Sequence, residues 1–103
     1  MKIEVLYIDD CPNWKDAGSL VREALALAGD TTTNVTFRLL RTPEEAAQVS
    51  FAGSPTVTLD GEDLFPNGGQ TTDLACRVYF TPSGLAGLPT VSQLWEALEA
   101  HAY

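Results

Sequence analysis

Hydrophobic and polar positions follow two different periods along this chain, and the changes of period predict its elements. Residues 3–8 (Ile-Glu-Val-Leu-Tyr-Ile) form a short apolar run that is typical of a buried strand. From Pro12 to Ala28, apolar residues recur every three or four positions, which predicts an amphipathic helix that stops at Gly29. Residues 34–40 then favour a second strand.

Capping and turn residues predict the middle of the chain. Thr42-Pro43-Glu44-Glu45 has the spacing of a capping box with proline at the first helical position, which predicts a short helix as far as about Val49. Residues 53–59 and 62–65 are two extended runs joined by Asp60-Gly61, a pair that favours a tight hairpin. Two antiparallel strands are therefore expected to follow one another here.

The last part of the chain predicts a long connection followed by a helix. Residues 66–88 are rich in Gly, Pro and Thr and predict a loop with at most one short helix around residues 73–79. Long loops in small domains are uncommon and tend to be functional. Thr90 and Gln93 have the spacing of a second capping box, which opens a final amphipathic helix.

This order of elements predicts a single α/β domain over residues 1–103. A strand-helix-strand start requires a crossover and gives a parallel pair, whereas the hairpin adds an antiparallel pair. We therefore expect a mixed four-stranded sheet with helices on both faces and an inserted loop before the last helix.

Composition narrows the functional classes. The chain has 103 residues, 45% of them hydrophobic, which is enough for a core without a metal or disulfide staple. Its net charge of −8 disfavours nucleic acid and anionic membranes as partners. No apolar run approaches the ~18 residues of a membrane span, and the start does not resemble a signal peptide, so a cytoplasmic protein is expected. No cofactor is indicated, and no His, Cys and carboxylate cluster has the spacing of a zinc site.

Cys11 is the main candidate for chemistry. It lies in Cys11-Pro12-Asn13-Trp14, where the first strand turns into the first helix, and the N-terminus of a helix stabilises a thiolate. The preceding Asp9 and Asp10 act in the opposite direction if they point at the sulfur. The alternative reading is a buried cysteine that packs as a small hydrophobic residue.

The element order, the Cys11-Pro12-Asn13-Trp14 turn and Ser54-Pro55-Thr56 together resemble the thioredoxin-like superfamily over nearly the whole chain. Within it, the chain is similar to small proteins that are sometimes labelled alkylmercury lyases. The resemblance implies a three-layer sandwich in which Pro55 is cis and lies beside Cys11. It also implies that the Ser54 backbone pairs with an extended substrate, and that Pro12 and Trp14 adjoin that substrate, although Trp14 is also suited to packing.

The motif departs from the family at its fourth position. Dithiol oxidoreductases of this superfamily have Cys-x-x-Cys, whereas this chain has Trp14 in place of the second cysteine. Cys76 is the candidate resolving partner, because the insertion starts at the end of the sheet that carries Cys11. Cys76 is equally suited to simple packing, and a bridge requires the two Cα atoms to lie within about 7 Å.

Two functions follow. The first is a thiol-disulfide oxidoreductase in which Cys11 attacks and Cys76 resolves, acting on a protein or a low-molecular-weight thiol or disulfide. The second is a binding module without turnover, which holds a soft metal ion between Cys11 and Cys76, with Asp10 nearby, or an extended peptide against Ser54-Pro55. The sequence leaves the oligomeric state open.

Overall fold

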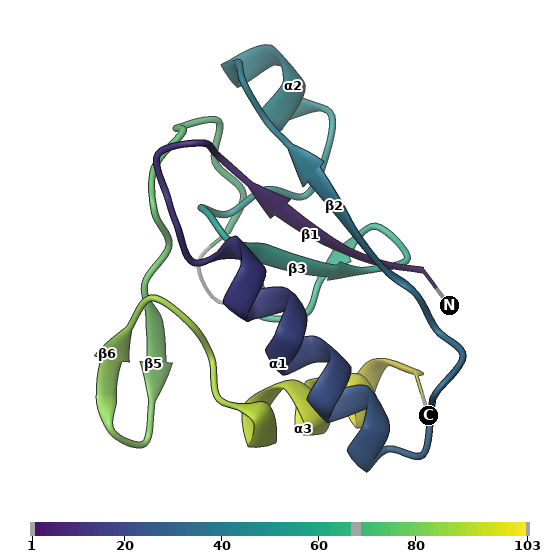
Figure 1. Cartoon of the computed structure of the whole chain (residues 1–103). Helices are drawn as coiled ribbons and strands as arrows, with labels where there is room; N and C mark the ends of the chain where they lie inside the picture. The colour runs from purple at the N-terminus through teal and green to yellow at the C-terminus, as the bar shows by residue number, and fades with distance from the viewer. Residues whose placement is uncertain (1, 67–68, 103) are drawn as a thin grey trace.

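A computed structural model describes residues 2–66 and 69–102 of the chain. Its helices and strands follow the predicted order, with one additional strand pair in the inserted segment (Figure 1). The elements are β1 (Ile3–Tyr7), α1 (Trp14–Leu27), β2 (Val35–Leu39), α2 (Pro43–Ala47), β3 (Thr56–Leu59), β4 (Glu62–Asp63), β5 (Tyr79–Thr81), β6 (Gly84–Ala86) and α3 (Val91–Ala102). None of the helices in the described ranges is long and apolar enough to cross a membrane.

The central sheet is mixed and four-stranded, as predicted, with the order β2-β1-β3-β4. β1 runs parallel to β2 and antiparallel to β3, and β3 pairs antiparallel with β4. The turn between β3 and β4 has positive φ angles at both central residues, 50° at Asp60 and 86° at Gly61. This is the conformation that an Asp-Gly pair favours in a two-residue hairpin, and it fixes the register of β4.

The two faces of the sheet are covered to different extents. Alternate residues of β1 and β3, such as Val5 and Val57, point towards α1 and α3, with which they form the larger hydrophobic cluster. Leu6 points to the other face, where it packs in a smaller cluster with Ala46 of α2 and with Phe51. In Figure 1, α1 and α3 lie on the lower side of the sheet and cross each other, and the short α2 lies at the upper end.

The second predicted capping box is complete, whereas the first is present in part, because the Glu45 side chain accepts from the Arg41 N–H at 2.9 Å instead of the Thr42 N–H. The Thr42 hydroxyl accepts from the Glu45 backbone N–H at 3.1 Å, and Thr90 and Gln93 cap each other reciprocally at 2.9 and 3.1 Å. These local hydrogen bonds satisfy backbone donors that the helix itself leaves unpaired, which is why the start of each helix was visible in the sequence.

The start of α1 differs from the prediction. The helix begins at Trp14 with Asn13 as N-cap, so Pro12 lies in the preceding turn and is not the first helical residue. The Cys11 N–H donates to the Ile8 carbonyl at 3.3 Å, and this tight turn returns Cys11 to the interior before the helix begins. Cys11 is therefore not the helix cap.

The inserted segment also differs from the prediction. Residues 73–79 are not helical. From Cys76 to Phe80 exposed and buried residues alternate, which is the period of an extended strand, and β5 and β6 then form an antiparallel hairpin. The segment is extended and not helical because the backbone groups of Ala75 and Arg77 form hydrogen bonds with Ser54, which is far away in the sequence.

Candidate functional site

A short extended segment of the insertion lies against the start of β3. We call residues 75–77 the strap. The Ser54 N–H donates to the Ala75 carbonyl at 2.9 Å, and the Arg77 N–H donates to the Ser54 carbonyl at 2.8 Å. These two bonds form a parallel bridge in which Cys76 is the partner of Ser54. Both backbone hydrogen-bonding groups of Ser54 are thus occupied by the chain's own strap.

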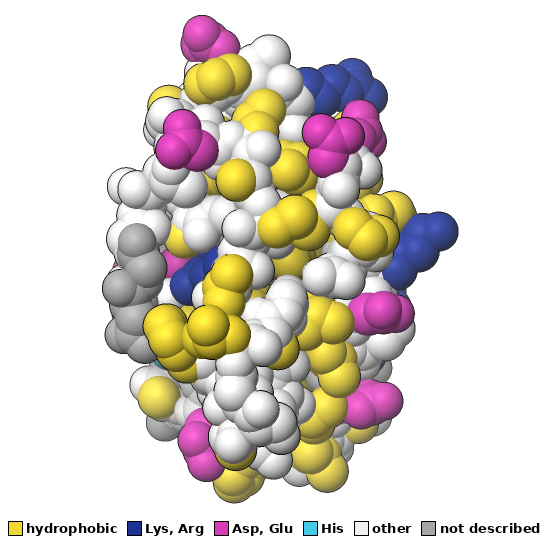
Figure 2. Space-filling model, turned by 90° about the vertical axis from the view of Figure 1, so that its left-hand side faces the viewer, with side chains coloured by type: hydrophobic (Ala, Val, Ile, Leu, Met, Phe, Trp, Pro, Cys, Tyr) yellow, Lys and Arg dark blue, Asp and Glu magenta, His cyan; other side chains and the backbone are white. Residues whose placement is uncertain are grey.

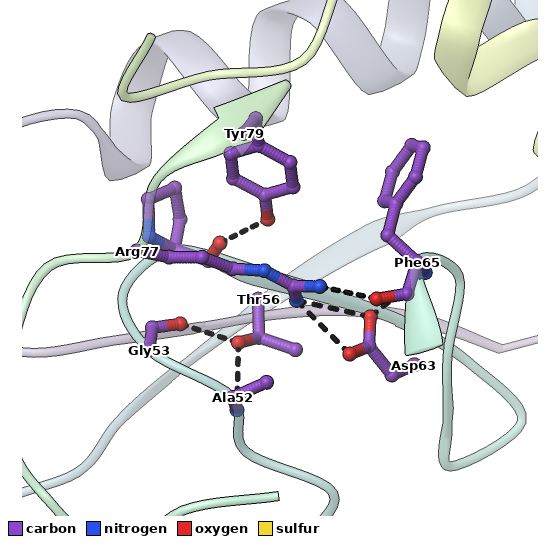
Figure 3. A network of polar contacts seen from close by, with 8 residues as sticks. Ala52, Gly53, Thr56, Asp63, Phe65, Arg77 and Tyr79 are labelled. Carbon is purple, nitrogen blue, oxygen red and sulfur yellow. Dashed lines mark hydrogen bonds and ion pairs between the residues drawn. The ribbon is translucent and has the colours of Figure 1, made fainter. Parts of the chain in front are cut away.

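The Arg77 side chain anchors the strap to the end of β4 and to Phe65. Its guanidinium donates to both carboxylate oxygens of Asp63, at 3.1 and 3.0 Å, and also to the Phe65 carbonyl (Figure 3). The two charged side chains are only 7% and 10% exposed, so the pair is buried. The guanidinium also lies 4.7 Å from the centre of the Tyr79 ring. Removing either charge would leave the other without compensation in a dry environment.

The residues that lead into β3 allow the strap to approach closely. Gly53 has a φ of 108°, and a Cβ atom placed there would lie 2.9 Å from Arg77 Cβ and 3.0 Å from Arg77 Cα. The Ser54–Pro55 peptide bond is cis, as expected. The Pro55 carbonyl accepts from the Tyr79 hydroxyl, whose pKa is raised by burial (Figure 3). Gly53, Ser54 and Pro55 therefore each contact the inserted segment.

Cys11 lies behind the strap in the hydrophobic interior. Its side chain is fully buried and packs in the cluster that contains Leu6 and Phe51. Its Sγ donates to the Ser54 carbonyl at 3.3 Å, so this oxygen accepts from both Cys11 and the strap. The Ser54 hydroxyl in turn accepts from the Ile8 N–H at 3.1 Å, which ties the turn before Cys11 to the start of β3.

Cys76 lies in front of Cys11 and is exposed. Its pKa is raised above the ordinary value, first because its thiol is hydrogen-bonded with the Cys11 thiol, and further by desolvation and by the negative charge of Asp10. Both cysteines therefore lie against Ser54, because Cys76 pairs with Ser54 in the parallel bridge and the Cys11 Sγ donates to the Ser54 carbonyl.

The structure brings together four of the predicted site residues and separates two. Cys11, Cys76, Ser54 and Pro55 meet at the strap. Pro12 is exposed in the turn before α1.

Trp14 belongs to the packing of the sheet. It stacks on Tyr7, with ring centres 4.4 Å apart, and its edge meets Phe37 at 5.4 Å. It is therefore a packing residue, which was the alternative that the sequence favoured.

Sequence reasoning missed Arg77, Asp63 and Tyr79. The sequence carried no signal for their burial, because a two-residue period over residues 76–80 predicts that the apolar Val78 and Phe80 are buried, whereas the structure exposes them and buries Arg77 and Tyr79. Within residues 2–66 and 69–102, no group of three or more His, Cys, Asp or Glu side chains is arranged to hold a metal ion.

Comparisons with known proteins return no match. No protein-family model matches the chain, and no curated protein or solved structure is significantly similar to it.

Proposed function

We propose that Cys11 and Cys76 form a reversible disulfide and that the protein is a thiol-disulfide oxidoreductase. The observation that carries this proposal is that both cysteines lie against Ser54: Cys76, which is exposed, pairs with Ser54 in the parallel bridge, and the Cys11 Sγ donates to the Ser54 carbonyl. A thiol pair can exchange with a partner only if one sulfur is accessible and the second is close enough to displace the partner. The exposure of Cys76 and its place beside the residue that holds Cys11 support the proposal on both counts.

We place the protein among the thioredoxin-like folds on three features of its architecture. The sheet order β2-β1-β3-β4, the cis peptide bond before Pro55 at the start of β3, and a cysteine in the turn after β1 all support this class. Cys76 then takes the part of the second cysteine that the motif lacks at Trp14. It reaches Cys11 from the inserted segment, across the cis-proline turn.

Burial favours an order of attack opposite to the one the sequence suggested. Cys11 is enclosed, whereas Cys76 faces solvent, so an external disulfide meets Cys76 first. In this scheme the Cys76 thiolate attacks the substrate disulfide, forms a mixed disulfide and releases the first substrate thiolate. Cys11 then attacks the Cys76 sulfur, forms the internal disulfide and releases the second. Two electrons pass to the substrate, and the two protein thiol protons end on the two product thiols.

Oxidation followed by peptide mapping tests the pair. Mild diamide treatment of the reduced protein should remove two hydrogens and give a Cys11–Cys76 crosslinked peptide. A protein that yields only intermolecular dimers or adducts under these conditions would refute the proposed function.

Single-cysteine variants test the order of attack. With a small aromatic disulfide as substrate, Cys11→Ser should accumulate a stable mixed disulfide at Cys76, whereas Cys76→Ser should react far more slowly. If Cys76→Ser reacts as fast as Cys11→Ser, Cys11 is the entry sulfur and the order is reversed.

A further inference from the structure

The exposed sulfur lies on the rim of an apolar pocket that the redox pair itself does not use. The pocket has a volume of about 290 Å³ and lies between the strap, the β5–β6 hairpin and the start of α3. Its lining includes Ala52, Phe65, Cys76, Val78, Phe80 and Gln93. A side chain in this pocket would therefore be adjacent to the reacting sulfur.

The pocket is built from fixed parts. The Gln93 side chain donates to the Phe80 carbonyl at 2.7 Å, which ties the hairpin to α3. On the side of the strap, the Arg77–Asp63 ion pair holds the segment in place, and the two opposite charges neutralise each other. The walls thus offer apolar surface and little free charge.

The size of the pocket indicates what it accepts. Small-molecule sites usually have volumes of about 300–1,000 Å³. A volume of about 290 Å³ is at the low end of that range and suits one apolar side chain better than a whole cofactor.

The charge of the protein and the exposure of the residues around the pocket both favour an apolar, uncharged partner. The protein has a net charge of −8, and Asp10 acts on Cys76, so an anionic thiol such as glutathione is repelled from this sulfur. Around the pocket, Val78 and Phe80 are 57% and 79% exposed, which is unusual for large apolar side chains. Figure 2 shows hydrophobic side chains gathered over the middle of the face on which the hairpin lies.

We propose that this pocket selects polypeptide substrates in which an apolar residue flanks the reacting cysteine. The proposal rests on the proposed function, because it assigns the substrate class of the same thiol pair. The apolar side chain enters beside Phe80 and places the substrate sulfur next to Cys76, where the exchange described above takes place.

Matched peptides test the selection on the wild-type protein. Acetyl-Leu-Cys-amide, acetyl-Ser-Cys-amide and glutathione are each prepared as the mixed disulfide with 5-thio-2-nitrobenzoate, and release of the coloured thiolate is followed under identical conditions. The leucine peptide should react about fivefold faster than the serine peptide, which corresponds to burying roughly half a leucine side chain. Glutathione should be the slowest. Equal rates for the leucine and serine peptides would overturn the proposal.

The hairpin offers a matched pair of variants. Phe80 and Leu85 are cross-strand partners and are both highly exposed, at 79% and 68%, but only Phe80 lines the pocket. Phe80→Ala should abolish the preference for leucine, whereas Leu85→Ala should retain it. Equal effects of the two substitutions would show that the pocket does not select the substrate. Formation of the Cys11–Cys76 disulfide with diamide does not depend on the pocket, so its presence separates failure of this inference from failure of the proposed function.

Discussion

Replacement of Gly53 by alanine tests the close approach of the strap to β3. Gly53 has a φ of 108°, and its missing Cβ would lie 2.9–3.2 Å from the Cβ, Cα and backbone N of Arg77. Two of these three atoms belong to the backbone and the third is fixed to it. The strap must therefore move away from β3 to admit a methyl group.

The expected loss of stability has two parts. A positive φ costs an L-residue about 1–2 kcal/mol relative to glycine. Forcing a methyl group into a well-packed region adds about 1–3 kcal/mol. Gly53→Ala should therefore lower the free energy of unfolding by about 2–5 kcal/mol. Gly61→Ala is the control, because Gly61 has a similar φ of 86° but nothing within 4 Å of the added Cβ. Gly61→Ala should therefore lose only about 1–2 kcal/mol, which is what a positive φ costs.

Urea titration of the reduced protein measures the free energy of unfolding of both variants. The same Gly53 variant should also form the Cys11–Cys76 disulfide more slowly with diamide, because displacement of the strap moves Cys76 away from Cys11. Gly61→Ala should form it at the wild-type rate. If the two variants lose equal stability and oxidise equally fast, the strap does not press on Gly53 and the account of how Cys76 is positioned is wrong.

Four further outcomes follow from the same contacts. Arg77→Met should lower the free energy of unfolding by about 3 kcal/mol or more in urea titrations, because it leaves the buried Asp63 without its partner. The alkylation rate of Cys76 should rise with pH to a midpoint above the ordinary value of ~8.5, and the midpoint should fall in Cys11→Ala, which removes the largest cause of the raised pKa. Asp30 has a pKa lowered from 3.8 to about 2, mainly by hydrogen bonds from Thr33 and Thr32, so its contribution to stability is present above pH 3.8 and lost as the pH falls towards 2. In Asp30→Ala, thermal melts should therefore show a smaller acid-induced decrease of the melting temperature over that window. Oxidation should raise stability towards urea by about 4 kcal/mol, because it closes a loop with 64 residues between the two sulfurs.

The elements that the sequence predicted are those specified by local chemistry. The Asp60-Gly61 turn and the Thr90–Gln93 capping box each depend on residues within a few positions of one another. The apolar run of β1 is also a local signature, because it lies within consecutive residues of one strand. The sheet order followed because a crossover and a hairpin restrict the arrangements of four strands.

The strap could not be predicted from local pattern. Residues 73–79 contain good helix formers, and the competing two-residue alternation is short. The deciding contacts are with Ser54, Gly53 and Asp63, which lie 14 or more positions earlier in the chain. Long-range hydrogen bonds of this kind override local propensity. Only the predicted topology indicated that Cys11 and Cys76 could lie close together. The sequence did not indicate that Cys76 is the more exposed of the two.

Cys11 and Cys76 are positioned mainly by groups other than their own sulfur atoms. Ser54 backbone bonds position Cys76 from both sides, and the Arg77–Asp63 pair anchors the strap one residue later. Cys11 is fixed by its turn and by the hydrophobic cluster around it. Formation of the disulfide removes both thiol hydrogens, so the bond from Cys11 to the Ser54 carbonyl is lost, but that oxygen retains the Arg77 N–H. The contacts that hold the strap are therefore expected to persist when the proposed disulfide forms. If the proposed function holds, the second cysteine that the Cys11-Pro12-Asn13-Trp14 turn lacks comes from a loop, which a buried ion pair and two backbone hydrogen bonds hold in place.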